Sequence, residues 1–431
     1  MSAAVMSIII LLICVVLFVT EVIPLVTTAI FGATAMAAFG VCSFSEAYGG
    51  FASDTVMLVV GMVTLGNALF ETGAARLIGN GIVKLAGDSE KLLLAISVTA
   101  AAALSMFLSN TATTAMFMAI ISGVVIVKPH MNKKDFFIPI GMGAVAGGTC
   151  TLVGSTPQVV AQGILQESLG KGFEFFDFAW VGVPIVIVMV IYFITIGYSI
   201  GKKTWGDRVD DEEPGQPAPA AKEAAAVAET IDMKKVYISL IIFALTVTAF
   251  ITKFFAQIGL TCMVAGVLCV LTGCISQKKV IDKMDWVAVG VLGGSLGMAK
   301  GLEVSGGGKM IADAFINLVG MDAAPFVIFA AIIFIVMALS QFMSNTACTA
   351  MLVPISLFIC KDMGLNPYAF AMGIIIAANM SFSTPVATTP ITLTLQGGYR
   401  FMDYVKVGGP FNIVAYFMVT FLTPVFFPLV L

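Results

Sequence analysis

A short run of small polar residues occurs twice in this chain. The heptapeptide Ser109–Ala115 (SNTATTA) returns at 344–350 with one residue changed, and nine of the twelve positions from Ser105 to Met116 are identical at an offset of 235. Amide and hydroxyl groups can donate hydrogen bonds to an oxyanion, and their oxygens are the ligands that small hard cations prefer. Because both copies lie inside apolar sequence, we expect them to bind a ligand rather than to serve packing.

A pair of irregular stretches follows the two motifs. Residues 141–158 and 377–390 are rich in Gly, Ser, Thr and Pro, which interrupt otherwise apolar sequence. Such clusters break helices, and broken backbone at membrane depth is tolerated only where it lines a cavity or is buried in protein. A kinked helix satisfied by its neighbours is the alternative, but the break recurs in both halves. We therefore expect both breaks to contribute to the same site as the motifs.

The composition is that of an integral membrane protein. The 431-residue chain is 59% hydrophobic and 11% charged, with a mean hydropathy of +1.04, whereas soluble domains carry roughly 25% charged residues. Its apolar stretches have the length of membrane helices, about 17 to 25 residues, and lack the alternation of barrel strands. We predict an all-α polytopic protein in the lipid bilayer. The net charge of −3 offers no basic surface, so a nucleic-acid partner is not expected.

The chain divides into two similar halves. Residues 202–235 are polar, with an acidic cluster followed by a Pro/Ala stretch, and we interpret them as a linker. The linker separates an N-terminal repeat, 1–201, from a C-terminal repeat, 236–431. Shorter sequence matches between the halves also support the duplication, such as the match of Asp54-Thr55-Val56 to Asp285-Trp286-Val287.

Each half is predicted to contain a re-entrant hairpin and a broken helix. The repeated motif lies midway through an apolar segment in both halves, about 90–127 and about 323–360. A polar turn is poorly accommodated inside a spanning helix, whereas a hairpin that enters and leaves on one side can carry it at its tip. The broken helices are expected at about 135–165 and about 366–398.

The distribution of positive charge predicts the orientation of the two halves. With the hairpins counted as non-spanning, each half has five transmembrane helices, and an odd number makes the repeats inverted. If both termini lie outside and the linker is cytoplasmic, 17 of the 22 Lys and Arg residues fall on the inner side, as the positive-inside rule requires. The expected location is the cell (inner) membrane. The five outside are Lys171, Lys253, Lys300, Lys309 and Lys361.

These features resemble the divalent anion:sodium symporter (DASS) family of the ion transporter superfamily. The resemblance covers essentially the whole chain and rests on the paired SNT hairpins and paired broken helices. The segment Thr20–Ala29 (TEVIPLVTTA) is similar to the TE-x-IPL-x-x-TA signature of that family. The stretches Gly154–Gln158 (GSTPQ) and Ala387–Ile391 (ATTPI) stand where the family usually has a GTPPN-like or ATPPN-like sequence. Both have Thr where that pattern has its first Pro, and neither ends in Asn.

The resemblance implies one Na⁺ site in each half, with Na⁺ as the coupling ion and no organic cofactor. The first site would use Ser105, Ser109, Asn110 and the Gly154 carbonyl. The second would use Ser340, Asn345 and the Ala387 carbonyl, with Ser344 as a further candidate. The substrate, a small anion, would lie between them and contact Asn110, Thr111, Ser155, Asn345, Thr346 and Thr388. The family also implies a homodimer and an elevator mechanism, in which hairpins and broken helices move against a fixed scaffold.

The charged residues are assigned no part in this site. No Arg or Lys lies near either motif or either break in the sequence, so helix N-termini would supply the positive potential for the anion. Glu21, between the first two spans, is interpreted as structural rather than as a proton carrier. Glu71 and Glu303 lie near span ends, where solvation at the membrane interface is the default interpretation.

The sequence therefore predicts a secondary transporter that moves a di- or tri-anion, a C4-dicarboxylate first among the candidates, by symport with Na⁺. One alternative is an H⁺-coupled or exchange-type anion permease of the same superfamily for sulfate, citrate or another oxyanion. A more distant alternative is a membrane enzyme, which would need a cluster of His, Cys, Asp or Glu residues that the sequence does not display. Catalytic residues are accordingly not assigned.

Overall fold

The N-terminal half is built from apolar helices of varied length. The computed structural model describes residues 2–430 except 84–86, 129, 206–231 and 320–323, so most of the predicted linker 202–235 lies outside the described residues. The helices of this half are α1 (Ala3–Thr20), α2 (Leu25–Ala38), α3 (Phe44–Tyr48), α4 (Asp54–Glu71), α5 (Ala74–Val83), α6 (Glu90–Ser105), α7 (Asn110–Val127), α8 (Phe137–Gly148), α9 (Thr156–Leu169), α10 (Ala179–Ile194) and α11 (Ile196–Trp205).

The C-terminal half repeats this order of elements. Its helices are α13 (Met233–Thr252), α14 (Ile258–Leu271), α15 (Gln277–Asp282), α16 (Trp286–Ser305), α17 (Gly307–Val319), α18 (Pro325–Leu339), α19 (Asn345–Met363), α20 (Pro367–Asn379), α21 (Thr389–Leu393) and α22 (Phe401–Phe426). Apart from an isolated bridge between Leu365 and Val430, the regular elements of the described chain are helical. The predicted all-α fold is confirmed.

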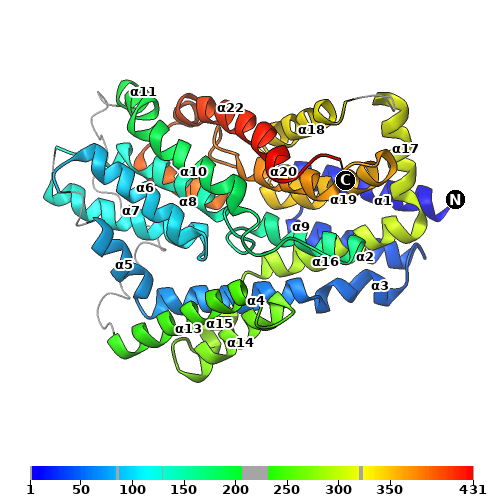
Figure 1. The fold of residues 1–431 in the computed structure, drawn as a ribbon, viewed down its shortest axis with the longest axis horizontal. Helices are drawn as coiled ribbons and strands as arrows, with labels where there is room; N and C mark the ends of the chain where they lie inside the picture. Colours follow the sequence, from blue (N-terminus) through cyan, green and yellow to red (C-terminus); the bar gives the residue numbers. More distant parts are fainter. Residues whose placement is uncertain (1, 84–86, 129, 206–231, 320–323, 431) are drawn as a thin grey trace.

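Both predicted hairpins consist of two helices joined by a short turn. In the first, α6 ends at Ser105 and α7 begins at Asn110; in the second, α18 ends at Leu339 and α19 begins at Asn345. Figure 1 shows α6 and α7 at the left of the molecule and α18 and α19 toward the right. In each case the second helix begins at the Asn of the SNT motif, because the preceding Ser adopts extended backbone and serves as its N-cap.

Helices α1–α4 and α13–α16 form a body whose close helix contacts depend on glycine. α4 packs along α14, and α16 packs along α2, so each pair joins one half of the chain to the other (Figure 1). A Cβ added to Gly61 would lie 2.2 Å from the carbonyl carbon of Cys262, and one added to Gly297 would lie 2.0 Å from the carbonyl oxygen of Ala47. Backbones that approach so closely leave no space for any larger residue. This body, α1–α4 and α13–α16, is called the scaffold below.

Seven helical segments of the described chain are long and apolar enough to cross a membrane, and an eighth is obtained if α10 and α11, bent by 47°, count as one span. Two of the seven are the hairpin helices α7 and α19. Helices α2, α14, α18 and α20 are apolar but shorter, at 13 to 15 residues. Short helices that end at polar breaks are the elements expected where a chain turns inside the bilayer.

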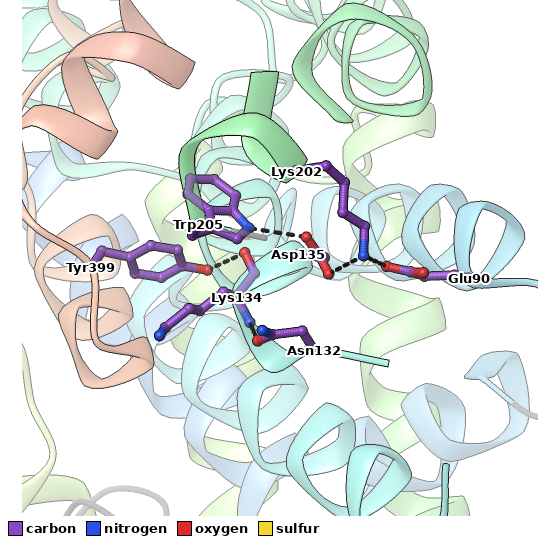
Figure 2. A network of polar contacts seen from close by, with 7 residues as sticks. All are labelled: Glu90, Asn132, Lys134, Asp135, Lys202, Trp205 and Tyr399. Carbon is purple, nitrogen blue, oxygen red and sulfur yellow. Dashed lines mark hydrogen bonds and ion pairs between the residues drawn. The ribbon is translucent and has the colours of Figure 1, made fainter. Parts of the chain in front are cut away.

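A buried polar network anchors the start of the first hairpin (Figure 2). Lys202 Nζ, at the end of α11, lies 2.7 Å from Asp135 Oδ2 and 2.8 Å from Glu90 Oε1, at the first residue of α6. The Trp205 indole donates to the other Asp135 oxygen at 2.9 Å. Asp135 belongs to the loop between α7 and α8, and burial raises the pKa of its carboxyl although both donors oppose that effect. The network therefore joins α11, the base of the hairpin and the entrance to α8.

Replacing Lys202 with methionine is expected to lower the free energy of unfolding by about 3 kcal/mol. This is the lower end of the cost of breaking a buried ion pair, because the Lys202 side chain is 36% exposed whereas that of Asp135 is 3% exposed. Thermal unfolding in detergent, followed by intrinsic fluorescence, would measure the effect. The matched control is Lys203→Met, since Lys203 is exposed. Equal unfolding temperatures for the two variants would contradict the assigned role of the network.

Candidate functional site

A cavity of about 680 Å³ lies where the two hairpin tips and the two helix breaks meet. One wall is formed by these elements and the opposite wall by the scaffold helices α4 and α16 with the turns that precede α2 and α16. Ten of the twelve sequence-predicted site residues line it, namely Ser109, Asn110, Thr111, Gly154, Ser155, Ser344, Asn345, Thr346, Ala387 and Thr388. The other two, Ser105 and Ser340, are fully buried at the ends of the first hairpin helices.

The two SNT motifs place helix N-termini at this cavity. Ser109 caps α7 by accepting a hydrogen bond from the Ala112 amide at 3.4 Å. Ser344 is the N-cap of α19, but its side chain makes no capping bond. The first N–H groups of a helix carry partial positive charge and lack intrahelical acceptors. Two such ends facing one cavity favour an anion.

The predicted first cation site is a tight cluster of polar atoms. One terminal atom of the Asn110 amide lies 2.5 Å from Ser105 Oγ, 3.0 Å from the Gly154 carbonyl and 3.3 Å from the Ala144 carbonyl. With its nitrogen in this position the amide donates to both carbonyls; with its oxygen there, four oxygens converge. Convergent oxygens are repulsive unless a cation neutralises them, and hard cations coordinate such groups.

The corresponding residues of the second half are arranged differently. Asn345 Oδ1 accepts a hydrogen bond from Ser381 Oγ at 3.0 Å, and Ser340 Oγ donates to the Met337 carbonyl at 3.1 Å. The structure thus joins Asn345 to a serine of the second helix break, which the sequence reasoning did not assign. Ser381 lies in the Ser-Phe-Ser-Thr-Pro segment of the irregular stretch 377–390, which was the available signal.

The two helix breaks are hydrogen-bonded to each other across the halves of the chain. Asn379, at the end of α20, accepts from Ser155 Oγ at 2.9 Å, and its amide nitrogen lies 3.3 Å from Gln158 Oε1. Gln158 in turn donates to the Gly148 carbonyl at 2.8 Å. Asn379 and Gln158 are buried, and neither was predicted as a site residue. They hold the two breaks in a fixed relation at the wall of the cavity.

Threonine hydroxyls at the site differ in whether they have partners. Thr151 donates to the Met106 carbonyl and Thr384 to the Gln341 carbonyl, so each break is tied to the turn of the hairpin in its own half. Thr388 lines the cavity at the second break, and its buried Oγ1 has, within the described chain, no hydrogen-bond partner. A buried hydroxyl without a partner is costly, so Thr388 is suited to bond a ligand.

The scaffold wall carries charged residues that were not predicted to belong to the site. Lys283, Asp285 and Glu21 all line the cavity, so the expectation that the site has no nearby Lys or Arg is wrong. The reason is the fold, because the turn before α16 packs against α4, where Asn67 donates to the Lys283 carbonyl at 3.0 Å. The sequence match of Asp54 with Asp285 located this turn in the chain, but it did not predict that the turn lies beside the SNT motifs.

Glu71 is buried rather than solvated at the membrane interface. Its side chain is 8% exposed and is paired with Lys283 at 2.7 Å and with Lys279. The sequence interpretation of Glu71 is therefore wrong, because Lys279 of α15 and Lys283, the residue that follows α15, both pair with it at the end of α4. Glu303 keeps an exposed side chain beside Lys300 at 3.2 Å.

The chain matches a family model and several curated proteins. The model described as citrate transporter matches residues 15–357 and 336–431. An uncharacterized transporter of Haemophilus influenzae is 30% identical, with 93% of this chain and 87% of that protein covered. The sodium-dependent dicarboxylate transporter SdcS of Staphylococcus saprophyticus is 25% identical, with 88% and 78% covered.

Solved structures with the same fold are also transporters. The Alcanivorax borkumensis YdaH transporter superposes with a TM-score of 0.65 at 11% identity, covering 89% of this chain and 87% of that one. Neisseria gonorrhoeae MtrF gives 0.60 at 14% identity, covering 88% and 83%. At such identities the likeness concerns the fold alone. The family and sequence matches confirm the resemblance drawn from the motifs. Together with the fold, they identify a multi-pass membrane transporter, not an enzyme. The chain belongs to the citrate transporter family.

Proposed function

We propose that this protein is a secondary active transporter that carries a small di- or tri-anion, a C4-dicarboxylate first among the candidates, in symport with Na⁺. The observation that carries the proposal is that both SNT helix ends and both breaks line one cavity. Two helix N-termini, two Asn amides and the free Thr388 hydroxyl supply donors suited to carboxylate oxygens. The SdcS relatives are named for dicarboxylates and the matched family for citrate.

Sodium coupling is supported by the first polar cluster. With its oxygen turned toward Ser105 Oγ and the Gly154 carbonyl, the Asn110 amide would join them in offering uncharged oxygens to a small cation, and bound Na⁺ would offset the charge of the anion. The second site would use Asn345, the Ala387 carbonyl and the neighbouring serines Ser340 and Ser344. The SdcS proteins are named sodium-dependent. The alternative of H⁺ coupling would favour a carboxylate in the hairpin wall, whereas the cavity carboxylates Glu21 and Asp285 belong to the scaffold.

The mechanism proposed is an elevator within a homodimer. The hairpins and broken helices would move as one body against the scaffold, and α5 and α17, which link scaffold to hairpin in the two halves, would act as arms. The proposed orientation keeps both termini outside and the linker 202–235 in the cytoplasm, so that the two halves of five spans are inverted. The glycine-mediated contacts within the scaffold suit a part that stays rigid.

Uptake into liposomes containing the purified protein tests this proposal. Radiolabelled succinate is expected to accumulate when an inward Na⁺ gradient is applied and to lose most of that uptake when choline replaces Na⁺. Competition by unlabelled citrate, sulfate and fumarate would rank the substrates. Equal uptake in choline, with acceleration by an inward proton gradient, would instead favour H⁺ coupling.

A further inference from the structure

One carboxylate of the scaffold lies against the tip of the second hairpin. Glu21 follows the last residue of α1 and lines the cavity. Its Oε1 accepts a hydrogen bond from the backbone N–H of Ser344, the N-cap of α19, at 3.2 Å. The contact joins residues 323 positions apart and crosses from the scaffold wall of the cavity to the hairpin wall.

The two hairpin tips differ in how their helix ends are satisfied. The N-terminus of α7 is capped by its own Ser109 hydroxyl, whereas Ser344 makes no side-chain capping bond to α19. Uncapped helix ends retain free N–H groups and positive potential. Glu21 accepts from the N–H of the N-cap residue Ser344, whereas Ser109 accepts from the N–H of Ala112 in the first turn of α7, so Glu21 is the side-chain acceptor at the tip of the second hairpin.

The backbone holds Glu21 in this place. Glu21 has a φ of +49°, and Lys253, which follows the first helix of the C-terminal half, has a φ of +51°; within the described chain they are the two non-glycine residues with positive φ. This conformation is costly for residues with a side chain. Lys253 also reaches a distant segment, with its Nζ 3.0 Å from Glu174 Oε1. Each half thus has a charged residue in left-handed backbone conformation directly after its first helix.

We infer that Glu21 is a substrate-release residue, an internal carboxylate that occupies the anion-binding end of α19 in this conformation. The inference rests on the proposed function, since the anion of the substrate would seek the same N–H groups. Glu21 and Asp285 add negative charge to the scaffold wall, while Lys283 is paired with Glu71 at 2.7 Å. A carboxylate fixed to the scaffold meets this helix end only while the hairpin is beside it. In this conformation Glu21 therefore competes with the bound anion for the N-terminus of α19. When the hairpin has moved away from the scaffold, Glu21 leaves that N-terminus free.

The test compares Glu21→Gln with wild type in equilibrium binding and in uptake. Radiolabelled succinate binding to the purified full-length protein in saturating Na⁺ is expected to tighten about threefold to fivefold, because the competing charge at the helix end is removed. The maximal rate of uptake should fall, since release becomes slower. The matched control is Glu303→Gln, whose carboxylate is on the scaffold helix α16 outside the cavity. Unchanged or weaker binding in Glu21→Gln would overturn the inference.

A second measurement does not depend on transport. Hydrogen exchange of backbone amides around Ser344 is expected to be about tenfold faster in Glu21→Ala than in wild type and to lie between the two in Glu21→Gln, which keeps a neutral acceptor, whereas amides around Ser109 should be unaffected. Equal exchange near Ser344 in all three proteins would show that Glu21 does not occupy this helix end. If wild type binds none of the anions tried, the proposed substrate class fails, while the exchange data still report on the Glu21 contact.

Discussion

Uptake is expected to fall by roughly a hundredfold or more when Asn110 or Asn345 is replaced by alanine. Each amide begins a hairpin helix and lines the cavity. Asn110 also contacts Ser105 Oγ and the Gly154 carbonyl, and Asn345 accepts from Ser381. Hydrogen bonds to charged groups contribute about 1.5–3 kcal/mol each. Loss of two such bonds to bound ligand per amide, about 3–6 kcal/mol, would reduce the ratio kcat/KM by about two to four orders of magnitude.

The matched control for these variants is Asn67→Ala. Asn67 lines the same cavity but lies on α4 in the scaffold, where its amide bonds the Lys283 carbonyl. If substrate and Na⁺ travel with the hairpins, this variant should retain uptake within about threefold of wild type. Initial rates would be measured in liposomes with equal amounts of folded protein. Full activity in both Asn110→Ala and Asn345→Ala would remove the site assignment.

Gly148→Ala is expected to abolish the first cation site without removing any of its ligands. A Cβ at this position would lie 2.5 Å from Asn110 Oδ1 and 2.7 Å from the Gly154 carbonyl. Because the Gly154 contact involves backbone, it cannot be relieved by a side-chain rotation. The displaced atoms are those proposed to bind Na⁺, so the Na⁺ concentration for half-maximal uptake should rise more than tenfold.

Gly123→Ala serves as the control for this change. Gly123 lies on α7, and a Cβ added to it meets no atom within 4 Å. Replacing an exposed helical glycine by alanine stabilises a helix by up to about 1 kcal/mol, so this variant should fold well and keep the wild-type Na⁺ dependence. A normal Na⁺ dependence in Gly148→Ala would show that the cluster around Asn110 is not a cation site.

The helical breaks could be anticipated from local sequence. Gly, Pro and Asn act on the backbone within a few residues, so the break between α8 and α9 falls within 141–158 and the break between α20 and α21 within 377–390. Each turn between hairpin helices likewise falls at the SNT motif, whose Ser occupies the N-cap position of the second helix. The all-helical membrane fold could also be predicted, from composition. Hydropathy is a sum over many residues and does not depend on particular contacts.

The scaffold side of the cavity could not be predicted. Lys283 and Asn67 are 216 residues apart and meet only because α4 packs along α14 and the turn before α16. Glu71 resembled an interfacial charge because its burial depends on α15, which the hydropathy pattern does not locate. The contact of Glu21 with Ser344 similarly requires the relative position of two bodies, and local propensity carries no information about it.

The Asn379 amide has a consequence for how the two halves respond to ligands. By accepting from Ser155 and lying 3.3 Å from Gln158, it links the break of one half to the break of the other. A ligand that orders either break therefore orders both, and the loss of conformational entropy is incurred once rather than twice. If each half binds a ligand as proposed, occupancy of one half is expected to raise the affinity of the other. The two halves of the chain would then behave as a single thermodynamic unit.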